Sequence, residues 1–399
     1  MSISSSDPQA GFHPRAVSAP QAELQAWRRF IAVLLVVTAA IVVFSFAFVA
    51  IVDPYDSLAF SPPWKRYRIT TNERYAFPGM IRHGRFDSAV FGTSTIMLLK
   101  PAELDKSLGG RFANLAMSYA TPWEQSQMMK FFGDHVHSPV RTILVAVDMD
   151  WCSPTTPLAQ LTPHPFPPWE YDDDPWNDYA HLLNTRALLH SAREALTLAH
   201  LARSEFQDDG YYQFTPDDSR YDPDRAHAAL YYGPWAVAAT RGAHDEPPPA
   251  GPRPPDWTFP DLSLLAQSLD GFPAATRKIL VFVPLHVSIL LNAEEWTKFT
   301  HCKAAAVDIA RTRPNVGVID FMRPSPLTRN DEAYWDSVHY RVRHATEIVD
   351  AIGSAFTDGH DSGSLFEVLW RPRRTSYRRE GIRYVHSMQF KGSWRERKG

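Results

Sequence analysis

The stretch FDSAVFGTSTIMLLKP, residues 86–101, has the pattern of a buried strand that ends in a sharp turn. An apolar run, residues 89–91, is followed directly by Gly92-Thr93-Ser94. A small hydroxyl residue after a strand is either a helix N-cap, which satisfies free amide donors, or a nucleophile held at the carboxyl edge of a sheet. Position alone leaves both interpretations of Ser94 open.

Similar apolar runs recur along the chain and alternate with helical segments. The runs are short, rich in Val, Ile, Leu and Phe, and bounded by turn or polar residues, which is typical of strands. Strands are predicted over residues 86–93, 112–117, 142–148, 278–285 and 316–321, and helices over 122–135, 178–204, 293–313 and 341–356. This alternation predicts a three-layer α/β/α fold with a parallel, flavodoxin-like sheet, in which ligands bind at the carboxyl ends of the strands.

The composition of the 399 residues fits a chain with a substantial core, because 44% are hydrophobic and 13% aromatic. The net charge of -3 is unremarkable, and the excess of basic over acidic residues lies in the tail from Leu365 onward. Neither the tail nor the rest of the chain therefore predicts a nucleic-acid partner. Cys152 and Cys302 are too few for a disulfide framework or a cysteine zinc site, so neither a metal nor another cofactor is expected. One bridge between them is possible in an oxidising compartment, but two buried free thiols are the favoured interpretation.

Residues 30–52, FIAVLLVVTAAIVVFSFAFVAIV, contain no charge and no proline. At a helical rise of 1.5 Å, about 23 residues cross the roughly 30 Å hydrocarbon core of a bilayer. A cleaved signal peptide is the alternative, since Ala47 and Ala50 are small. The apolar core is longer than such peptides use, so an uncleaved anchor is expected.

The charges that flank this span predict its orientation. Arg28 and Arg29 precede it, whereas Asp53 and Asp56 follow it. By the positive-inside rule the N-terminus stays in the cytoplasm and the rest of the chain lies outside. For a bacterial chain, this means a single-pass protein of the inner membrane whose main domain is in the periplasm.

The predicted organisation has four parts and two insertions. Proline-rich stretches interrupt the main domain and have too little periodic apolar sequence for cores of their own. The parts are a cytoplasmic segment (1–29), the transmembrane helix (30–52), the α/β domain (53–357) with insertions at about 151–177 and 206–260, and a basic tail (358–399) expected to be disordered.

A possible partner for Ser94 lies near the end of the predicted domain. The stretch YWDSVHYRVRHATEIVDAI, residues 334–352, places Asp336 three residues before His339 and directly ahead of a helix. A nucleophilic serine needs a base and an acid that orients it, and residues i and i+3 of a tight turn approach closely. Alternatively, Asp336 caps the turn and His339 packs on the sheet.

Together these segments resemble the SGNH, or GDSL-like, hydrolase superfamily over roughly residues 80–356. The family has four sequence blocks in a set order, and each has a counterpart here. In chain order the counterparts are residues 92–94, 114–118, 145–148 and the D-x-x-H of 336–339. The resemblance implies that Ser94 is the nucleophile, His339 the general base and Asp336 the acid that orients it.

An anchored, outward-facing member resembles the proteins that O-acetylate exported polysaccharides. The resemblance therefore implies a serine acyl-ester hydrolase or O-acyltransferase that acts on a polysaccharide or another acylated envelope glycan. If the acyl group is transferred, a multi-span membrane protein must export it, because one span cannot. The alternative is a catalytically inactive module that keeps the fold and binds or assembles glycan.

The sequence departs from the family pattern in both blocks that usually supply the oxyanion donors. The usual glycine of the second block is absent, and the candidates there are Ser118, Tyr119 and Ala120. The usual asparagine of the third block is replaced by Asp148 or Asp150. An ionised aspartate repels an oxyanion, and the loss of one such donor lowers the rate about 10²- to 10³-fold.

Two further features are candidates for contact with a substrate. His286 ends another predicted strand and either faces the substrate or bonds a loop. The tryptophans of the 151–177 insertion either stack on sugar rings or pack internally.

Overall fold

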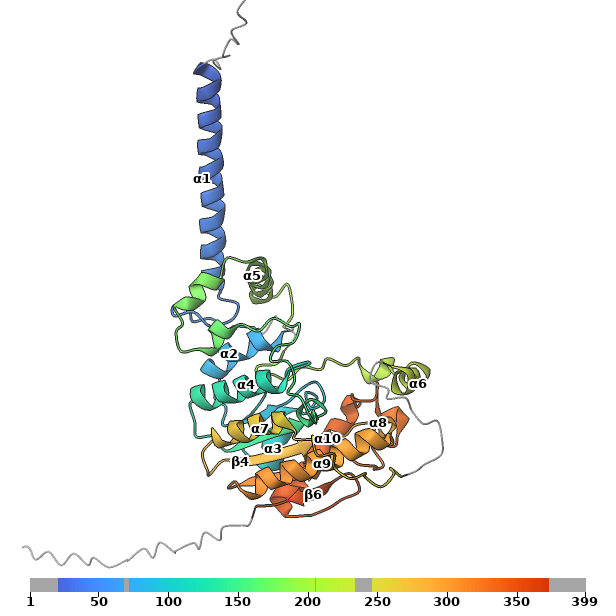
Figure 1. Ribbon diagram of the computed structural model, residues 1–399. Coiled ribbons are helices and arrows are strands. Elements are labelled where there is room, and N and C mark those ends of the chain that lie inside the picture. The colour runs from blue at the N-terminus through green and yellow to red at the C-terminus, as the bar shows by residue number, and fades with distance from the viewer. Residues whose placement is uncertain (1–20, 68–71, 205, 234–245, 373–399) are drawn as a thin grey trace, which may run out of the picture.

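The computed structural model describes residues 21–67, 72–204, 206–233 and 246–372. A six-stranded sheet with the order β2-β1-β3-β4-β5-β6 forms its centre (Figure 1). Strands β1 to β5 pair in parallel, and β6 pairs antiparallel with β5. The strands are β1 Ser88–Phe91, β2 Phe112–Asn114, β3 Thr142–Val147, β4 Arg277–Phe282, β5 Val316–Asp320 and β6 Glu367–Trp370.

The prediction of an α/β fold with a mostly parallel sheet is confirmed. Each predicted strand segment contains a strand, and all residues of β1, β3 and β5 are buried. Such unbroken apolar runs are typical of parallel strands, because helices cover both of their faces.

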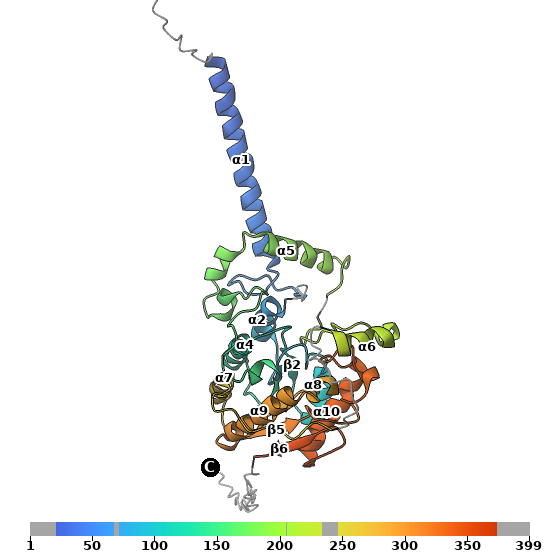
Figure 2. The same cartoon turned by 45° about the vertical axis from the view of Figure 1, so that its right-hand side comes forward.

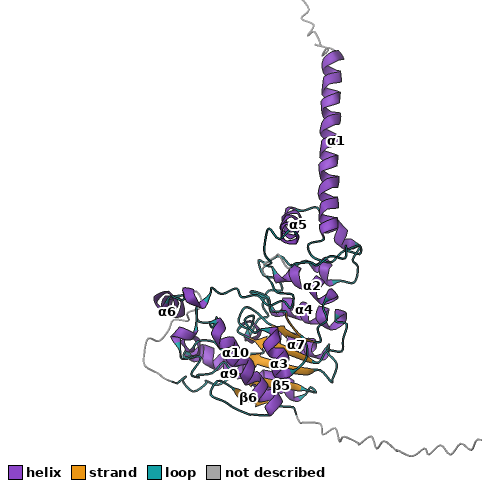
Figure 3. Ribbon diagram, turned by 180° about the vertical axis from the view of Figure 1, so that it is seen from behind, coloured by secondary structure: helices purple, strands orange, loops and turns teal. Residues whose placement is uncertain are grey.

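Two groups of helices pack among themselves around the sheet (Figure 3). In one group α3 contacts α10, and in the other α7 contacts α4 and α9. The predicted helix over 122–135 is α4, which begins at a capping box formed by Thr121 and Glu124. The helices around the sheet are α2 Glu73–His83, α3 Pro101–Leu108, α4 Pro122–His135, α7 Pro260–Asp270, α8 Val287–Leu290, α9 Ala293–Arg311 and α10 Ala345–Gly353.

The N-terminal helix α1, Gln21–Val52, extends away from the sheet (Figure 1). Its segment 23–52 is long and apolar enough to cross a membrane, and most of it is exposed. By length and composition, both a membrane anchor and a signal sequence fit. Its last turns pack against the domain, where Val49 joins a buried cluster with Tyr55 and Leu182.

The segment predicted as one helix over 178–204 is shorter and divided. A 3₁₀ turn, η3 Asn177–His181, precedes the helix α5, Thr185–Leu198, which begins at the N-cap Asn184. Helix α5 lies across the lower end of α1 (Figure 2). In the second predicted insertion, residues 223–232 form α6.

The expectation of disorder from residue 358 onward is wrong for the described part of the tail. Residues 367–370 form β6 on the edge of the sheet, and Phe366 is buried against Phe321. A short edge strand is stabilised by its neighbour rather than by its own pattern, so its sequence carried no signal. Residues 373–399 lie outside the described part.

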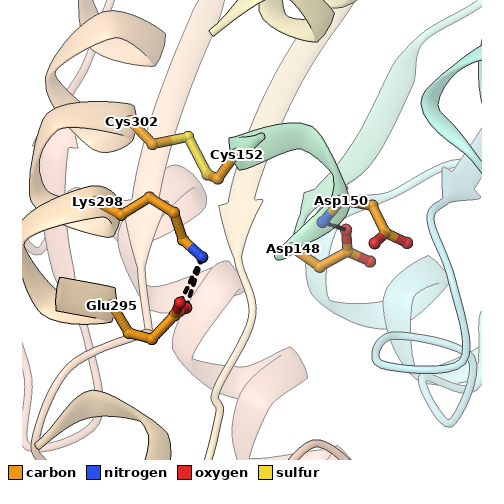
Figure 4. The surroundings of a disulfide bond; sticks show 6 residues. All are labelled: Asp148, Asp150, Cys152, Glu295, Lys298 and Cys302. Carbon is orange, nitrogen blue, oxygen red and sulfur yellow. Dashed lines mark hydrogen bonds and ion pairs between the residues drawn. A yellow bond between two sulfur atoms is a disulfide. The ribbon is translucent and has the colours of Figure 1, made fainter. Parts of the chain in front are cut away.

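The expectation of two free thiols is also wrong, because Cys152 and Cys302 form a disulfide (Figure 4). Cys152 ends the 3₁₀ turn η1, Asp150–Cys152, which follows β3, and Cys302 lies in α9. The turn and the helix pack together. Since 150 residues separate the cysteines, only the tertiary packing brings them together.

Candidate active site

The turn after β1 places Ser94 at the carboxyl edge of the sheet. Gly92 has φ +154°, and a Cβ there would lie 2.6 Å from the Cβ of Ala146. Glycine is therefore required where β1 passes β3, because both the backbone angle and the contact exclude a side chain.

The structure brings Ser94 and His339 into contact although 245 residues separate them. The Oγ of Ser94 lies 2.8 Å from Nε2 of His339. On the other side of the ring, Nδ1 lies 2.8 Å from Oδ2 of Asp336. An ionised carboxylate only accepts hydrogen bonds, so Nδ1 of a neutral ring carries the proton and Nε2 can accept one from Ser94.

The second carboxyl oxygen of Asp336 stabilises the turn on which His339 lies. It accepts hydrogen bonds of 2.9 Å from the backbone amides of Val338 and His339. Burial acts to raise the pKa of Asp336, but the hydrogen bond to His339, the imidazole charge and the two amides outweigh it and lower the pKa. Asp336 therefore caps the turn, as in the second alternative drawn from the sequence, and at the same time holds Nδ1 of His339, as in the first.

His286 lies behind this turn and not in the site. Its ring is fully buried, with Nδ1 2.9 Å from Oγ of Ser288 and Nε2 3.2 Å from Oδ1 of Asp331. Its backbone amide donates to the carbonyl of Ser337, within the turn that bears Asp336 and His339. This geometry does not fit the substrate contact and fits the alternative of a strand-end histidine bonded within the protein, because both ring nitrogens lie at hydrogen-bond distance from Ser288 and Asp331.

Asp148 supports the turn that bears Ser94. It is buried, and its Oδ2 accepts hydrogen bonds from the hydroxyls of Thr93 (2.6 Å) and Thr95 (3.4 Å), the residues on either side of Ser94. Burial raises the pKa of Asp148. The carboxyl therefore holds the residues on both sides of Ser94 and uses its lone pairs there.

Asp150 lies beside Asp148 (Figure 4). Both aspartates line a small pocket next to Ser94. Its backbone amide donates to Oδ1 of Asp148 at 3.2 Å. Burial, together with the neighbouring carboxylates of Asp148 and Asp261, raises the pKa of Asp150 to about 7. Near neutral pH a large share of Asp150 is thus protonated and able to donate a hydrogen bond.

Two of the three residues predicted as second-block donors, Ser118 and Ala120, bond to groups other than Ser94. The hydroxyl of Ser118 donates to Glu73 at 2.8 Å, and the backbone amide of Ala120 donates to the carbonyl of Met117. Tyr119 lies between them with φ +55°, and its exposed ring lines the pocket. The predicted roles of Ser118 and Ala120 therefore do not fit this geometry.

The pocket next to Ser94 is small, with a volume of about 50 Å³. Such a space accommodates a group of a few heavy atoms. The larger cavities among the described residues, of about 360 to 600 Å³, include neither Ser94 nor His339. The pocket is lined by Thr93, Ser94, Thr95, Tyr119, Asp148, Met149, Asp150, Val338 and His339.

Both insertions reach the rim of this site through residues that the sequence did not single out. Phe214 packs edge-on against His339, with ring centres 5.2 Å apart, and His164 stacks on Tyr119 at 6.0 Å. The tryptophans pack elsewhere: Trp151 is buried and bonded to Gln125, and Trp169 stacks on His181. Aromatic residues in proline-rich loops are too common for their sequence to mark these contacts.

Within the described ranges, no group of three or more His, Cys, Asp or Glu residues is arranged to hold a metal ion. No protein-family model matches the chain, and no curated protein matches it.

Proposed function

We propose that this chain is a membrane-anchored, extracytoplasmic SGNH-type serine esterase or O-acyltransferase that acts on acyl esters of an envelope or exported polysaccharide. The observation that carries the proposal is the continuous series of contacts from Ser94 through His339 to Asp336, at 2.8 Å each. A serine with a base and an oriented acid at hydrogen-bond distance has the arrangement that activates a hydroxyl for attack on an ester.

In this mechanism Ser94 attacks the ester carbonyl while His339 takes its proton, and Asp336 stabilises the imidazolium. His339 then gives the proton to the departing alcohol, which leaves the acyl group on Ser94. Water, or a carbohydrate hydroxyl that His339 deprotonates, attacks the acyl-enzyme and restores Ser94. The about 50 Å³ pocket favours a small acyl group, such as acetyl.

The oxyanion needs donors, and two groups at the pocket suit this role. The backbone amide of Ser94 lies in the turn at the sheet edge, and Asp150 can donate in its protonated form. A preorganised donor of this kind contributes about 10² to 10³ in rate. We therefore assign to Asp150, rather than to Asp148, the position that an asparagine holds in the resembled family.

The fold supports the same proposal. The order β2-β1-β3-β4-β5 is that of flavodoxin-like doubly wound sheets. We propose a three-layer arrangement in which α3 and α10 cover one face and α4, α7 and α9 the other. Such sheets bind ligands at the carboxyl ends of their strands, which is where Ser94 lies.

The disulfide supports the extracytoplasmic location. Bridges such as Cys152–Cys302 form and persist in oxidising compartments and are rare in the cytosol. This agrees with the orientation expected from the charges flanking α1, which place the domain outside the inner membrane. A polysaccharide acceptor is further favoured by the exposed ring of Tyr119, whose apolar face can stack on a sugar at the pocket rim.

The test is labelling of the full chain, in detergent micelles, with a fluorophosphonate probe, followed by peptide mass spectrometry. We expect an adduct on Ser94 that disappears in Ser94→Ala and in His339→Ala. Ser118→Ala is the matched control, because the hydroxyl of Ser118 bonds Glu73 and the adduct should persist without it.

One observation favours an inactive glycan-binding module as the second candidate. Neither Ser118 nor Ala120 presents a donor to the pocket, so the oxyanion side lacks the usual glycine amide. A folded chain that stays unlabelled over a range of pH would overturn the enzymatic proposal and favour this one.

A further inference from the structure

Helix α5 exposes several of its leucines and buries several of its polar side chains. Ser191, Glu194 and Thr197 face the domain and are buried. Leu189 and Leu196, which lie on the outer side, are 63% and 48% exposed. This is the reverse of a surface helix in a water-soluble domain, whose apolar stripe faces the core.

Specific polar contacts fix the helix in this orientation. Glu194 accepts a hydrogen bond of 2.8 Å from the backbone amide of Tyr67, and Nδ1 of His190 lies 2.9 Å from the hydroxyl of Tyr55. Arg186 donates to the hydroxyl of Tyr75 at 3.1 Å. Rotation of the helix to bury its leucines would break these bonds, so the exposed apolar face is built into the fold.

The exposed face lies next to the end of the apolar helix α1. Figure 2 shows α5 crossing the lower end of α1 at a large angle, and in Figure 1 the same helix is seen nearly end-on. The two helices pack against each other, and Val49 and Ala187 share one buried cluster. If α1 crosses a bilayer, α5 therefore lies in the plane of its surface.

The length of the uncovered part of α1 predicts where α5 lies relative to the hydrocarbon core of the bilayer. The part of the apolar span that the domain leaves uncovered, residues 30–45, is about 24 Å long at 1.5 Å per residue. A hydrocarbon core is roughly 30 Å thick, which is about 6 Å, or four helical residues, more than this part. The core therefore reaches the turns of α1 where Phe46, Phe48 and Val49 contact the domain. These are the turns beside α5, so its outer face lies at the edge of the hydrocarbon.

Exposed aromatic residues continue the same surface. The rings of Phe60 and Trp176 are 73% and 60% exposed and pack edge to face, with centres 5.3 Å apart. Trp176 in turn stacks on Tyr179, which contacts Phe46 of α1. Tryptophan and other aromatic rings concentrate at the level of the lipid headgroups, so this pair marks the same boundary as α5.

We infer that the outer face of α5, with the Phe60–Trp176 pair, docks on the boundary between headgroups and acyl chains of the membrane that α1 crosses. Arg186 and Arg193 on the same helix suit anionic headgroups, as in other interfacial amphipathic helices. A second attachment beside α1 prevents the domain from swinging and holds its sheet at a set distance from the bilayer. The inference rests on the anchoring role of α1, but not on the chemistry of Ser94.

The test uses the full chain in phosphatidylcholine vesicles with a minor share of phosphatidylglycerol. Since both native cysteines are in the disulfide, single cysteines can be introduced and labelled with an environment-sensitive fluorophore. The sites are Leu189→Cys and Leu196→Cys on α5, Val37→Cys within α1, and the exposed Ala228→Cys on α6 as the matched control. Emission is quenched separately by nitroxide-bearing lipids and by aqueous iodide.

We expect both α5 labels to lose emission to the lipid quencher and to resist iodide, whereas the α6 label does the opposite. Labels on α5 that behave like the one on α6 would overturn the inference, and so would labels shielded from both quenchers, which a second copy or another protein would cover. A Val37 label that the lipid quencher does not affect would show that α1 does not cross the bilayer, which would also overturn the inference. Fluorophosphonate labelling of Ser94 reports on the proposed chemistry independently of all these outcomes.

Discussion

The two sides of the pocket differ in how their polar groups are used. On one side Ser94, His339 and Asp336 form a series of hydrogen bonds that ends at the hydroxyl of Ser94, which lines the pocket. On the other side Asp148 and Ser118 bond to groups inside the protein. In our proposal the nucleophile is therefore assembled before any substrate arrives, whereas stabilisation of the oxyanion depends on fewer groups and on the protonation of Asp150.

The largest expected effect comes from Asp336→Asn on the assembled side. Asparagine can donate to Nδ1 of His339 and so favours the wrong tautomer, and the analogous change in a serine protease triad lowers the rate about 10⁴-fold. We expect a similar fall in the rate of fluorophosphonate labelling. Asp331→Asn is the matched control, because Asp331 contacts the histidine outside the site, His286. Equal labelling rates for both variants would contradict the proposed role of Asp336 in orienting His339.

Removal of the disulfide tests how much the bridge between η1 and α9 stabilises the folded chain. Cys152→Ala with Cys302→Ala removes the bridge that ties η1, and with it Asp150, to α9. We expect the free energy of unfolding to fall by about 2–5 kcal/mol, since the bridge closes a long loop. Urea unfolding of the detergent-solubilised chain measures this. An unchanged midpoint with an unchanged slope would contradict the expectation.

Thr93→Val tests the support of the nucleophile turn by Asp148. The variant leaves a buried carboxyl without its 2.6 Å partner, which costs about 1–3 kcal/mol in stability. The labelling rate should also fall, because Ser94 follows Thr93 directly. Thr93→Ser keeps the hydroxyl and should retain both stability and rate. If both variants behave alike, the hydroxyl is not what supports the turn.

The most gradual effect should appear in the pH dependence of labelling. With a pKa of about 7, Asp150 donates a hydrogen bond below that pH and loses the proton above it. The labelling rate should therefore decline as the pH rises through 7. Asp150→Asn remains a neutral donor, so its rate should not decline over the same range. A parallel decline in both would show that another group causes it.

Much of the fold could be predicted because its signals are local. Each parallel strand is an apolar run between turn residues, and α4 carries its start signal in Thr121 and Glu124. The edge strand β6 could not be predicted, because packing against its neighbour decides it. The split of the segment 178–204 has a local signal in the N-cap Asn184, which the prediction of one long helix overlooked.

The sequence by itself determined the strand-turn that presents Ser94 and the short turn in which Asp336 meets His339. Both depend on contacts between residues close in the chain, where a glycine or an i, i+3 spacing restricts the backbone. Only the tertiary structure decided that these turns meet, that Cys152 and Cys302 pair, and that Asp148 holds the serine turn while Asp150 opens onto the pocket. Such contacts join distant segments, and their partners are chosen by the packing of the whole sheet and its helices.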